Sequence, residues 1–294
     1  MKKSRLCAST LIVSLGAIAI FAAAQAQEKG NAATVPDFSG VWARANVPDS
    51  VDERIDAKKF PRVRYGSMFF PVPGDNAGKP VAFLEGNNPD EVVGDYNSPI
   101  LQPWVQAIVK KNAESELQDR YVPTAHGTCW PSGVPEVLNL REPVQLLQRT
   151  DKITIIYQRD HQVREISLGG THPAHPELSW YGNSVGHYEG DTLVVDTIGQ
   201  APKPMSVVDP FGTPHTDKLH VIERYRLIQD RRGKGLEVVF TVEDPGAFTM
   251  PWKGMVIYRP SRDPFEEVVC AENDRSFGEG SSFGDIPKQD KSDF

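Results

Sequence analysis

The chain has 294 residues, and its 32 Lys and Arg against 39 Asp and Glu give a net charge of −7. An acidic surface repels phosphate backbones, so this balance argues against nucleic acid as a partner. No segment beyond the N-terminus approaches the ~20 consecutive apolar residues of a membrane-spanning helix, so no membrane span is expected in the mature protein.

The N-terminus has the pattern of a secretory signal peptide. Three cationic residues within the first five positions precede an apolar run from 6 to about 24, and Ala24-Gln25-Ala26 supplies the small residues that a signal peptidase reads. We therefore expect residues 1–26 to be removed and the protein to act in the periplasm or outside the cell. Removing those three cations leaves 29 Lys and Arg against 39 Asp and Glu, a net charge of −10. An uncleaved anchor is the alternative.

The mature chain is expected to form a single domain at 36–273, between a flexible lead at 27–35 and a polar mobile tail at 274–294. Pro36 to Trp42 has the pattern of a turn followed by a first strand. The segment 51–99 is rich in Pro, Gly, Asp and Asn, so we expect irregular structure there. Such a long loop is either a functional lid or a structural covering of the core.

One helix is predicted, beginning at Ser98-Pro99 and ending near Asp119. Its apolar residues recur at helical spacing and form one face. That face consists of Leu101, Trp104, Val105, Ile108 and Val109. We interpret it as a packing surface rather than a ligand site.

From Val144 onward the alternation of apolar and polar residues predicts about nine strands, joined mainly by hairpin-length turns and without intervening helices. The predicted ranges are 144–149, 153–158, 163–168, 184–188, 192–198, 219–228, 236–242, 255–258 and 267–270. An antiparallel meander of this kind closes as a lipocalin-like barrel or folds over as a sandwich. The sequence therefore predicts a mainly β protein with one N-terminal helix and a long irregular N-terminal segment.

Two cysteines remain after signal cleavage, Cys129 and Cys270. An even number of cysteines in an oxidising compartment predicts a disulfide. The bond would close a loop of about 140 residues, to which the chain-entropy model assigns roughly 4–5 kcal/mol as an upper figure. Two separate thiols or a metal pair are the alternatives.

Glu223 is unusual because it shares one strand face with the apolar side chains of Val221 and Tyr225. A carboxylate on a buried face must be ion-paired, protonated or in a wet cavity. The structural interpretation is an ion pair with an arginine from another strand. The functional interpretation is an acid inside a barrel cavity, since perturbed carboxylates gather at active sites.

Four histidines lie between 172 and 215 and are candidates for a site. His187 and Glu189 are two apart on a predicted strand, so they share a face as an acid/base pair or as solvent-facing residues. His172 and His175 form an H-x-x-H pair in a proline-held loop. They are candidate metal ligands, although this spacing in a loop lacks the helical geometry of H-E-x-x-H, and the alternative is hydrogen-bonded loop histidines.

Three further residues are candidates for contacting a ligand. His215 lies in a turn before the Glu223 strand, close enough along the chain to reach the same end of a barrel. Trp180 and Tyr188 belong to an aromatic set that lines a ligand cavity or packs in the core.

The span SWYGNSVGHYEGDTLVVDTIG, with GTPHTDKLHVIERYR, EDPGAFTMPW and VCAEN further along, resembles a widespread family of secreted bacterial β-rich proteins. Members share the pattern W-x-G-x-S-x-G-x-W-E-G-D-T-L-V-V-D-T, and the resemblance covers about 38–273. Tyr188 stands where the pattern usually has Trp, and His187 where Arg is frequent. If a cation at 187 matters, this member is pH-sensitive there. The resemblance implies secretion and a shared site-bearing hairpin, and it implies no particular reaction.

These features predict a periplasmic or secreted enzyme of hydrolase or lyase type, acting on a small, partly apolar organic molecule by acid/base chemistry. In this hypothesis His187 and Glu189 move the proton and Glu223 stabilises charge. The substrate would be oriented or packed by His172, His215, Trp180 and Tyr188. No cofactor is favoured, and a divalent metal at His172 and His175 is the lesser alternative. The competing hypotheses are a non-catalytic periplasmic small-molecule binding protein and a structural or interaction module of the envelope.

Overall fold

A computed structural model describes most of the chain between Asp37 and Cys270. The residues it describes are 35–45, 68–71, 84–85, 92–94, 96–118, 122–123, 125 and 127–270. The expected signal peptide, nearly all of the lead, the tail and most of the expected irregular segment lie outside the described residues. The chain divides into two units, Met1–Pro36 and Asp37–Phe294, and every helix and strand below belongs to the second.

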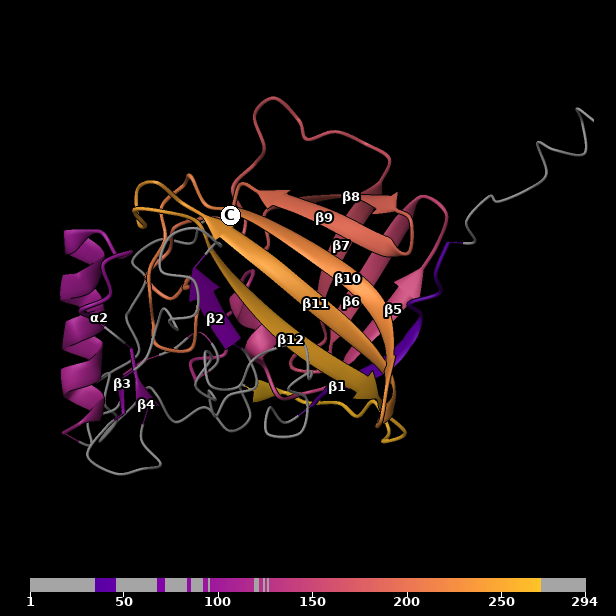
Figure 1. The fold of residues 1–294 in the computed structure, drawn as a ribbon, viewed down its shortest axis with the longest axis horizontal. Coiled ribbons are helices and arrows are strands. Elements are labelled where there is room, and N and C mark those ends of the chain that lie inside the picture. The colour runs from indigo at the N-terminus through magenta and orange to yellow at the C-terminus, as the bar shows by residue number, and fades with distance from the viewer. Residues whose placement is uncertain are drawn as a thin grey trace, which may run out of the picture. The chain divides into compact units, whose positions relative to one another are not determined.

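Nine strands close into a β-barrel (Figure 1). The barrel closes because its last strand in the chain, β12, pairs with its first, β1. In order around the barrel the strands are β1 (Gly40–Arg44), β5 (Val144–Gln148), β6 (Lys152–Tyr157), β7 (Gln162–Leu168), β8 (Asn183–Glu189), β9 (Thr192–Ile198), β10 (His220–Asp230), β11 (Gly233–Glu243) and β12 (Trp252–Pro260). The mainly β, lipocalin-like barrel is therefore confirmed, and the alternative arrangement as a sandwich is not formed.

Two pairings depart from a simple antiparallel meander. β7 and β8 run parallel, with Ile166 opposite Ser184, because the connection 169–182 returns the chain before β8 begins. The strand predicted at 267–270 is wrong, since Val268 makes only an isolated bridge to Arg159. β1 occupies the closing position instead, between β5 and β12. Closure thus joins two ends of the sequence, which local alternation does not detect.

The segment that the sequence predicted as irregular contributes three short strands. β2 (Met68–Pro71) pairs with the first half of β12, beside the half that pairs with β1. β3 (Leu84–Glu85) and β4 (Val92–Val93) form a separate two-stranded sheet.

The barrel interior is apolar over most of its length, as the alternation predicted. Leu236, Val238, Phe240 and Val242 point inward from β11 and are at most 1% exposed. Because each side chain is fully buried, each contributes about 1.5–3 kcal/mol of hydrophobic free energy to folding. The alternating pattern of β10 and β11 thus identifies the side chains that lie inside the barrel.

The helix α2 (Pro103–Glu116) begins four residues later than predicted, with Pro103 in its first turn. Leu101 instead bridges to Phe248, outside the helix. The buried stripe is Val105, Val109 and Ala113. Trp104 and Ile108, which were predicted to share this face, are 42% and 37% exposed, so the predicted face is wrong by part of a turn.

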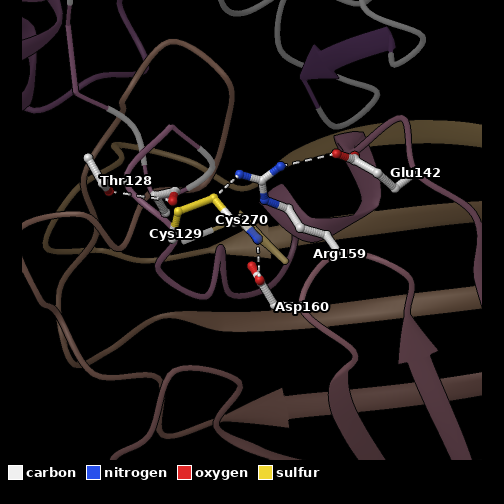
Figure 2. The surroundings of a disulfide bond; sticks show 7 residues. Thr128, Cys129, Glu142, Arg159, Asp160 and Cys270 are labelled. Carbon is white, nitrogen blue, oxygen red and sulfur yellow. Dashed lines mark hydrogen bonds and ion pairs between the residues drawn. A yellow bond between two sulfur atoms is a disulfide. The ribbon is translucent and has the colours of Figure 1, made fainter. Parts of the chain in front are cut away.

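The predicted disulfide joins Cys129 to Cys270, which are 141 residues apart in the sequence (Figure 2). It ties the loop before the short 3₁₀ helix η2 (Glu136–Asn139) to the segment that follows β12. Such a bond is compatible with a protein that resides outside the cytoplasm. Among the described residues, no helix has the length and apolar character needed to cross a membrane.

Candidate functional site

His187 and Glu189 lie on the outer surface of the barrel. Strand alternation points both side chains away from the interior, and these side chains are 57% and 50% exposed. Nε2 of His187 is 3.2 Å from a carboxylate oxygen of Glu189, so the predicted pairing on one face is present. A hydrogen bond from Arg224 on β10, followed by that from His187, holds the pKa of Glu189 below its usual value. The pair therefore lies on a solvated surface beside Arg224.

Glu223 lies on the opposite side of the barrel wall, inside, with no exposed area. Two guanidinium nitrogens of Arg164, on β7, donate to its two carboxylate oxygens at 3.0 and 2.5 Å. The hydroxyl of Tyr225 donates to the same carboxylate at 2.6 Å. The interpretation as an ion pair with an arginine of another strand thus describes the geometry.

The conspicuous hairpin motif supplies the remaining partners of Arg164. The hydroxyls of Ser184 on β8 and Thr197 on β9 accept from its guanidinium at 3.0 and 2.9 Å, and they contact each other at 3.0 Å. Burial opposes the charge of Arg164, but the Glu223 carboxylate outweighs it and holds the pKa of Arg164 well above its usual value. The cluster is buried and densely hydrogen-bonded, so it fills and braces the barrel interior.

His172 fastens the 169–182 loop to the outer wall. Its Nδ1 lies 2.6 Å from the amide oxygen of Asn183, and its Nε2 lies 3.0 Å from a carboxylate oxygen of Asp196. His220 approaches the same oxygen of Asp196 at 3.0 Å. His175 is exposed in that loop. Within the part of the chain that the structure describes, no three His, Cys, Asp or Glu side chains are grouped to hold a metal ion.

His215 is buried, and its hydrogen bonds join it neither to the Arg164–Glu223 cluster nor to the outer-wall contacts of His172. Its Nδ1 lies 2.8 Å from the carbonyl oxygen of Thr216, to which it must donate, so in the neutral ring Nε2 accepts from Ser206 at 2.7 Å. Burial lowers the pKa of His215, so the neutral form is favoured. This histidine is satisfied by local hydrogen bonds.

The two aromatic candidates lie in different environments. Trp180 packs against Trp130 with ring centroids 5.3 Å apart, and the Lys203 ammonium lies 4.9 Å from its ring centroid. The hydroxyl of Tyr188 accepts from Gln148 at 3.0 Å, and its ring packs against the core. The structure therefore does not bring the sequence-predicted site residues to one opening: some lie outside the wall, and others are enclosed by it.

A cavity of about 370 Å³ lies elsewhere, between the end of β1, the helix η2, the approach to β5 and the loop 207–210. Its volume falls at the small end of the range for ligand pockets, about 300–1,000 Å³. The polar lining side chains are Arg44, Glu136, Asn139, Arg141, Glu142 and Asp209. Apolar side chains complete the wall.

Glu136 is a strongly perturbed group in this cavity. It is 7% exposed, and the side-chain amide of Asn139 donates to its Oε2 at 3.0 Å. Burial, reinforced by the charge of Asp209, raises the pKa of Glu136 to about 8. Glu136 therefore carries a proton at neutral pH and can donate a hydrogen bond or a proton.

Asp209 is 3% exposed but sits in a different environment. One of its oxygens accepts the backbone N–H groups of Phe211 at 2.9 Å and Thr213 at 3.1 Å. Burial raises the pKa of Asp209, while these hydrogen bonds oppose the rise by favouring the charged form. The cavity therefore holds two buried carboxyl groups in different hydrogen-bonding surroundings, and carboxyl pairs of this kind are what acid/base sites use.

The cavity also holds positive charge. Arg44 donates to the backbone carbonyl of Asn139, and burial lowers the pKa of its guanidinium, although arginine remains charged at any physiological pH. Arg141 is exposed at the rim of the cavity.

The disulfide is connected through Arg159 to Glu142, a residue that lines the cavity; Figure 2 shows these contacts. Glu142 lines the cavity and pairs with Arg159 at 3.2 Å, and Arg159 in turn donates to the sulfur of Cys270 at 2.6 Å. Cys270 also donates its backbone N–H to Asp160 at 2.8 Å. The cross-link thus holds the residue that positions Glu142.

Sequence reasoning missed this site, although a signal for it exists. Glu136 stands between the apolar runs Val134-Pro135 and Val137-Leu138, and Asp209 stands between Val208 and Pro210. Each is an acid in an apolar stretch, the same oddity that drew attention to Glu223. Neither lies on a regular strand, so no alternation marked them as buried.

No protein-family model, no curated protein and no solved structure matches this chain. The protein is therefore characterised by its own structure, a closed nine-stranded barrel with a small cavity that holds two buried carboxyl groups.

Proposed function

We propose that this protein is an extracytoplasmic enzyme of hydrolase or lyase type that acts by acid/base chemistry on a small, partly apolar organic molecule. The reaction would take place in the cavity of Glu136 and Asp209. The observation that carries the proposal is the pair of buried carboxyls in one cavity, one of which keeps its proton at neutral pH. The disulfide supports a location outside the cytoplasm.

The residues divide the chemistry as follows. Glu136 gives its proton to the leaving group or to the oxygen on which negative charge develops. Asp209, favoured as the carboxylate by two backbone amides, takes a proton from water or from the substrate. Arg44 stabilises the negative charge of the transition state. The roles first assigned to His187 and Glu189 remain a hypothesis for a solvent-exposed surface.

Turnover by matched variants tests the proposal. Purified protein is screened against small esters, lactones and hydroxy acids, and turnover of the best substrate is compared among Glu136→Gln, Asp209→Asn and Glu165→Gln. Loss of a general acid or base lowers turnover about 10²-fold or more. Glu165 is an exposed acid on β7, so its variant is the control. Wild-type turnover should also fall as the pH rises through about 8, where Glu136 loses its proton.

His187→Ala separates the two locations for the site. A large loss in His187→Ala with full turnover in Glu136→Gln would overturn the cavity proposal and favour the surface pair.

A non-catalytic small-molecule carrier is the second candidate. The observation in its favour is the hydrogen bond that Asn139 donates to one oxygen of Glu136, because a carboxyl group held in this way can serve to bind a ligand without transferring a proton. Saturable binding in this cavity without turnover of any substrate in the screen would select it.

A further inference from the structure

We infer that the ligand of this cavity is a small monocarboxylate whose oxyanion is bound by Arg44 and Arg141 and whose body is apolar. This inference rests on the proposed function, because it uses the same cavity, but it concerns the class of ligand rather than the reaction. It follows from the charge, the geometry and the size of the cavity.

The charge of the lining favours an anion. Two arginines, Arg44 and Arg141, line the cavity. Of the acids, Glu142 is already paired with Arg159 at 3.2 Å, and Glu136 is uncharged at neutral pH. Asp209, the third acid of the lining, is bound by backbone N–H groups and, among the described residues, not by an arginine. Arg44 and Arg141 therefore outnumber the acids that could balance their charge within the lining.

The geometry favours a planar oxyanion over other anions. Arg44 is partly buried, and among the described residues its guanidinium donates to one acceptor, the carbonyl of Asn139. A guanidinium presents five donors in a planar fork that matches a carboxylate. A protonated Glu136, which lines the same cavity, adds an O–H donor from which a bound carboxylate would accept.

The size of the cavity and its apolar wall limit the rest of the ligand. Ala125, Leu140, Val207 and Pro210 supply the apolar lining. A volume of about 370 Å³ suits a body of one small ring or a short chain, since larger ligands occupy pockets further up the usual range.

Three probes of one shape and different charge test the inference by isothermal titration calorimetry on the intact oxidised protein. Benzoate, benzamide and benzylamine are titrated at pH 6.5 and physiological salt. We expect benzoate to bind at least tenfold more tightly than either of the other two. Equal or tighter binding of benzamide or benzylamine would overturn the inference.

Variants assign the binding to the two arginines. Arg44→Met should weaken benzoate binding at least tenfold, and Arg141→Gln, at an exposed rim position, should weaken it several-fold without affecting folding. Arg149→Gln is the control, since Arg149 is an exposed arginine outside this cavity, with a side chain 71% exposed. Benzoate binding that is unchanged in both single variants, Arg44→Met and Arg141→Gln, would contradict the assignment. A loss of binding in Arg149→Gln as large as the loss in those two variants would contradict it as well.

The pH dependence reports on Glu136 among its charged neighbours, which are Arg44, Arg141, Glu142 and Asp209. Benzoate affinity should fall above pH 8 in the wild type and stay level in Glu136→Gln, whose amide keeps a donor at every pH. A parallel fall in both proteins contradicts a role for Glu136 in holding the oxyanion.

The two proposals fail separately. If benzoate binds but no substrate is turned over, the proposed enzymatic function is wrong and the proposed monocarboxylate ligand stands. If benzoate does not bind but neutral or cationic substrates are turned over in a reaction that depends on Glu136, the proposed monocarboxylate ligand is wrong and the proposed enzymatic function stands.

Discussion

At the scale of single residues, three acids in apolar surroundings have three different outcomes. Glu223 is ion-paired with Arg164, Asp209 is held by backbone amides, and Glu136 keeps its proton. Each outcome avoids an isolated buried charge, which is very costly. The third leaves a group that changes its charge near physiological pH, and this is why Glu136 is the better candidate for chemistry.

The raised pKa of Glu136 predicts how stability depends on pH. Between its ordinary pKa of 4.5 and about 8, the folded state holds a proton that the unfolded state has lost, so stability falls as the pH rises through this window. Glu136→Gln removes this dependence. We expect the variant to match the wild type at pH 4 and to be a few kcal/mol more stable at pH 9.

Urea unfolding at the two pH values measures this difference. Glu165→Gln, at an exposed position, controls for the loss of a negative charge. A Glu136→Gln variant that is less stable than the wild type at pH 9 would show that the carboxylate is well paired there.

The buried pair of Arg164 and Glu223 predicts strong coupling between two positions. Glu223→Met alone leaves a buried guanidinium without its counter-charge and should cost about 3–5 kcal/mol. The double variant Arg164→Met/Glu223→Met should be clearly more stable than either single variant, because two apolar side chains need no counter-charge. A double-mutant cycle from denaturant unfolding gives the coupling energy, and additive losses would contradict it.

At the scale of elements, the hairpin motif of β8 and β9 is built for the barrel. Ser184 and Thr197 bind the buried Arg164, and Asp196 holds His172 on the outside. A Cβ at Gly186 would lie 2.9 Å from Ile166 and 3.1 Å from Leu168, so a glycine suits this place where the strands pack closely. The density of polar residues and glycines in this motif therefore reflects folding requirements as well as any function.

The helix α2 gives a prediction for two adjacent positions that sequence periodicity treated alike. Val109 is 1% exposed and Ile108 is 37% exposed. Val109→Ala should cost about 1–3 kcal/mol through lost burial, whereas Ile108→Ala should change stability by less than about 0.5 kcal/mol. Thermal or urea unfolding of the two variants compares them directly, and equal losses would restore the face that the sequence predicted.

At the scale of the whole molecule, closure depends on contacts between distant segments. β1 and β12 meet across most of the sequence, and the disulfide Cys129–Cys270 spans 141 residues. A cross-link over so long a loop restricts the unfolded chain strongly. It also supports the Arg159–Glu142 pair at the cavity wall.

Removal of the disulfide should therefore lower the free energy of unfolding by about 2–5 kcal/mol. Urea unfolding with and without reductant measures the loss, and Cys129→Ser/Cys270→Ser should reproduce the reduced protein and be insensitive to reductant. A loss below about 1 kcal/mol would show that the rest of the barrel already restrains these two segments.

Local chemistry in the sequence was sufficient for the fold class, the disulfide and most of the strands, because side-chain alternation has a period of two and is written in neighbouring residues. The same rule placed His187 and Glu189 on one face, but it does not say which face is inside. That decision, and the meeting of Arg44, Glu136 and Asp209 in one cavity, belong to the tertiary structure. These three residues come from a strand end, a 3₁₀ helix and a loop that lie far apart in the chain. The tertiary fold brings them together, and no local pattern encodes that proximity.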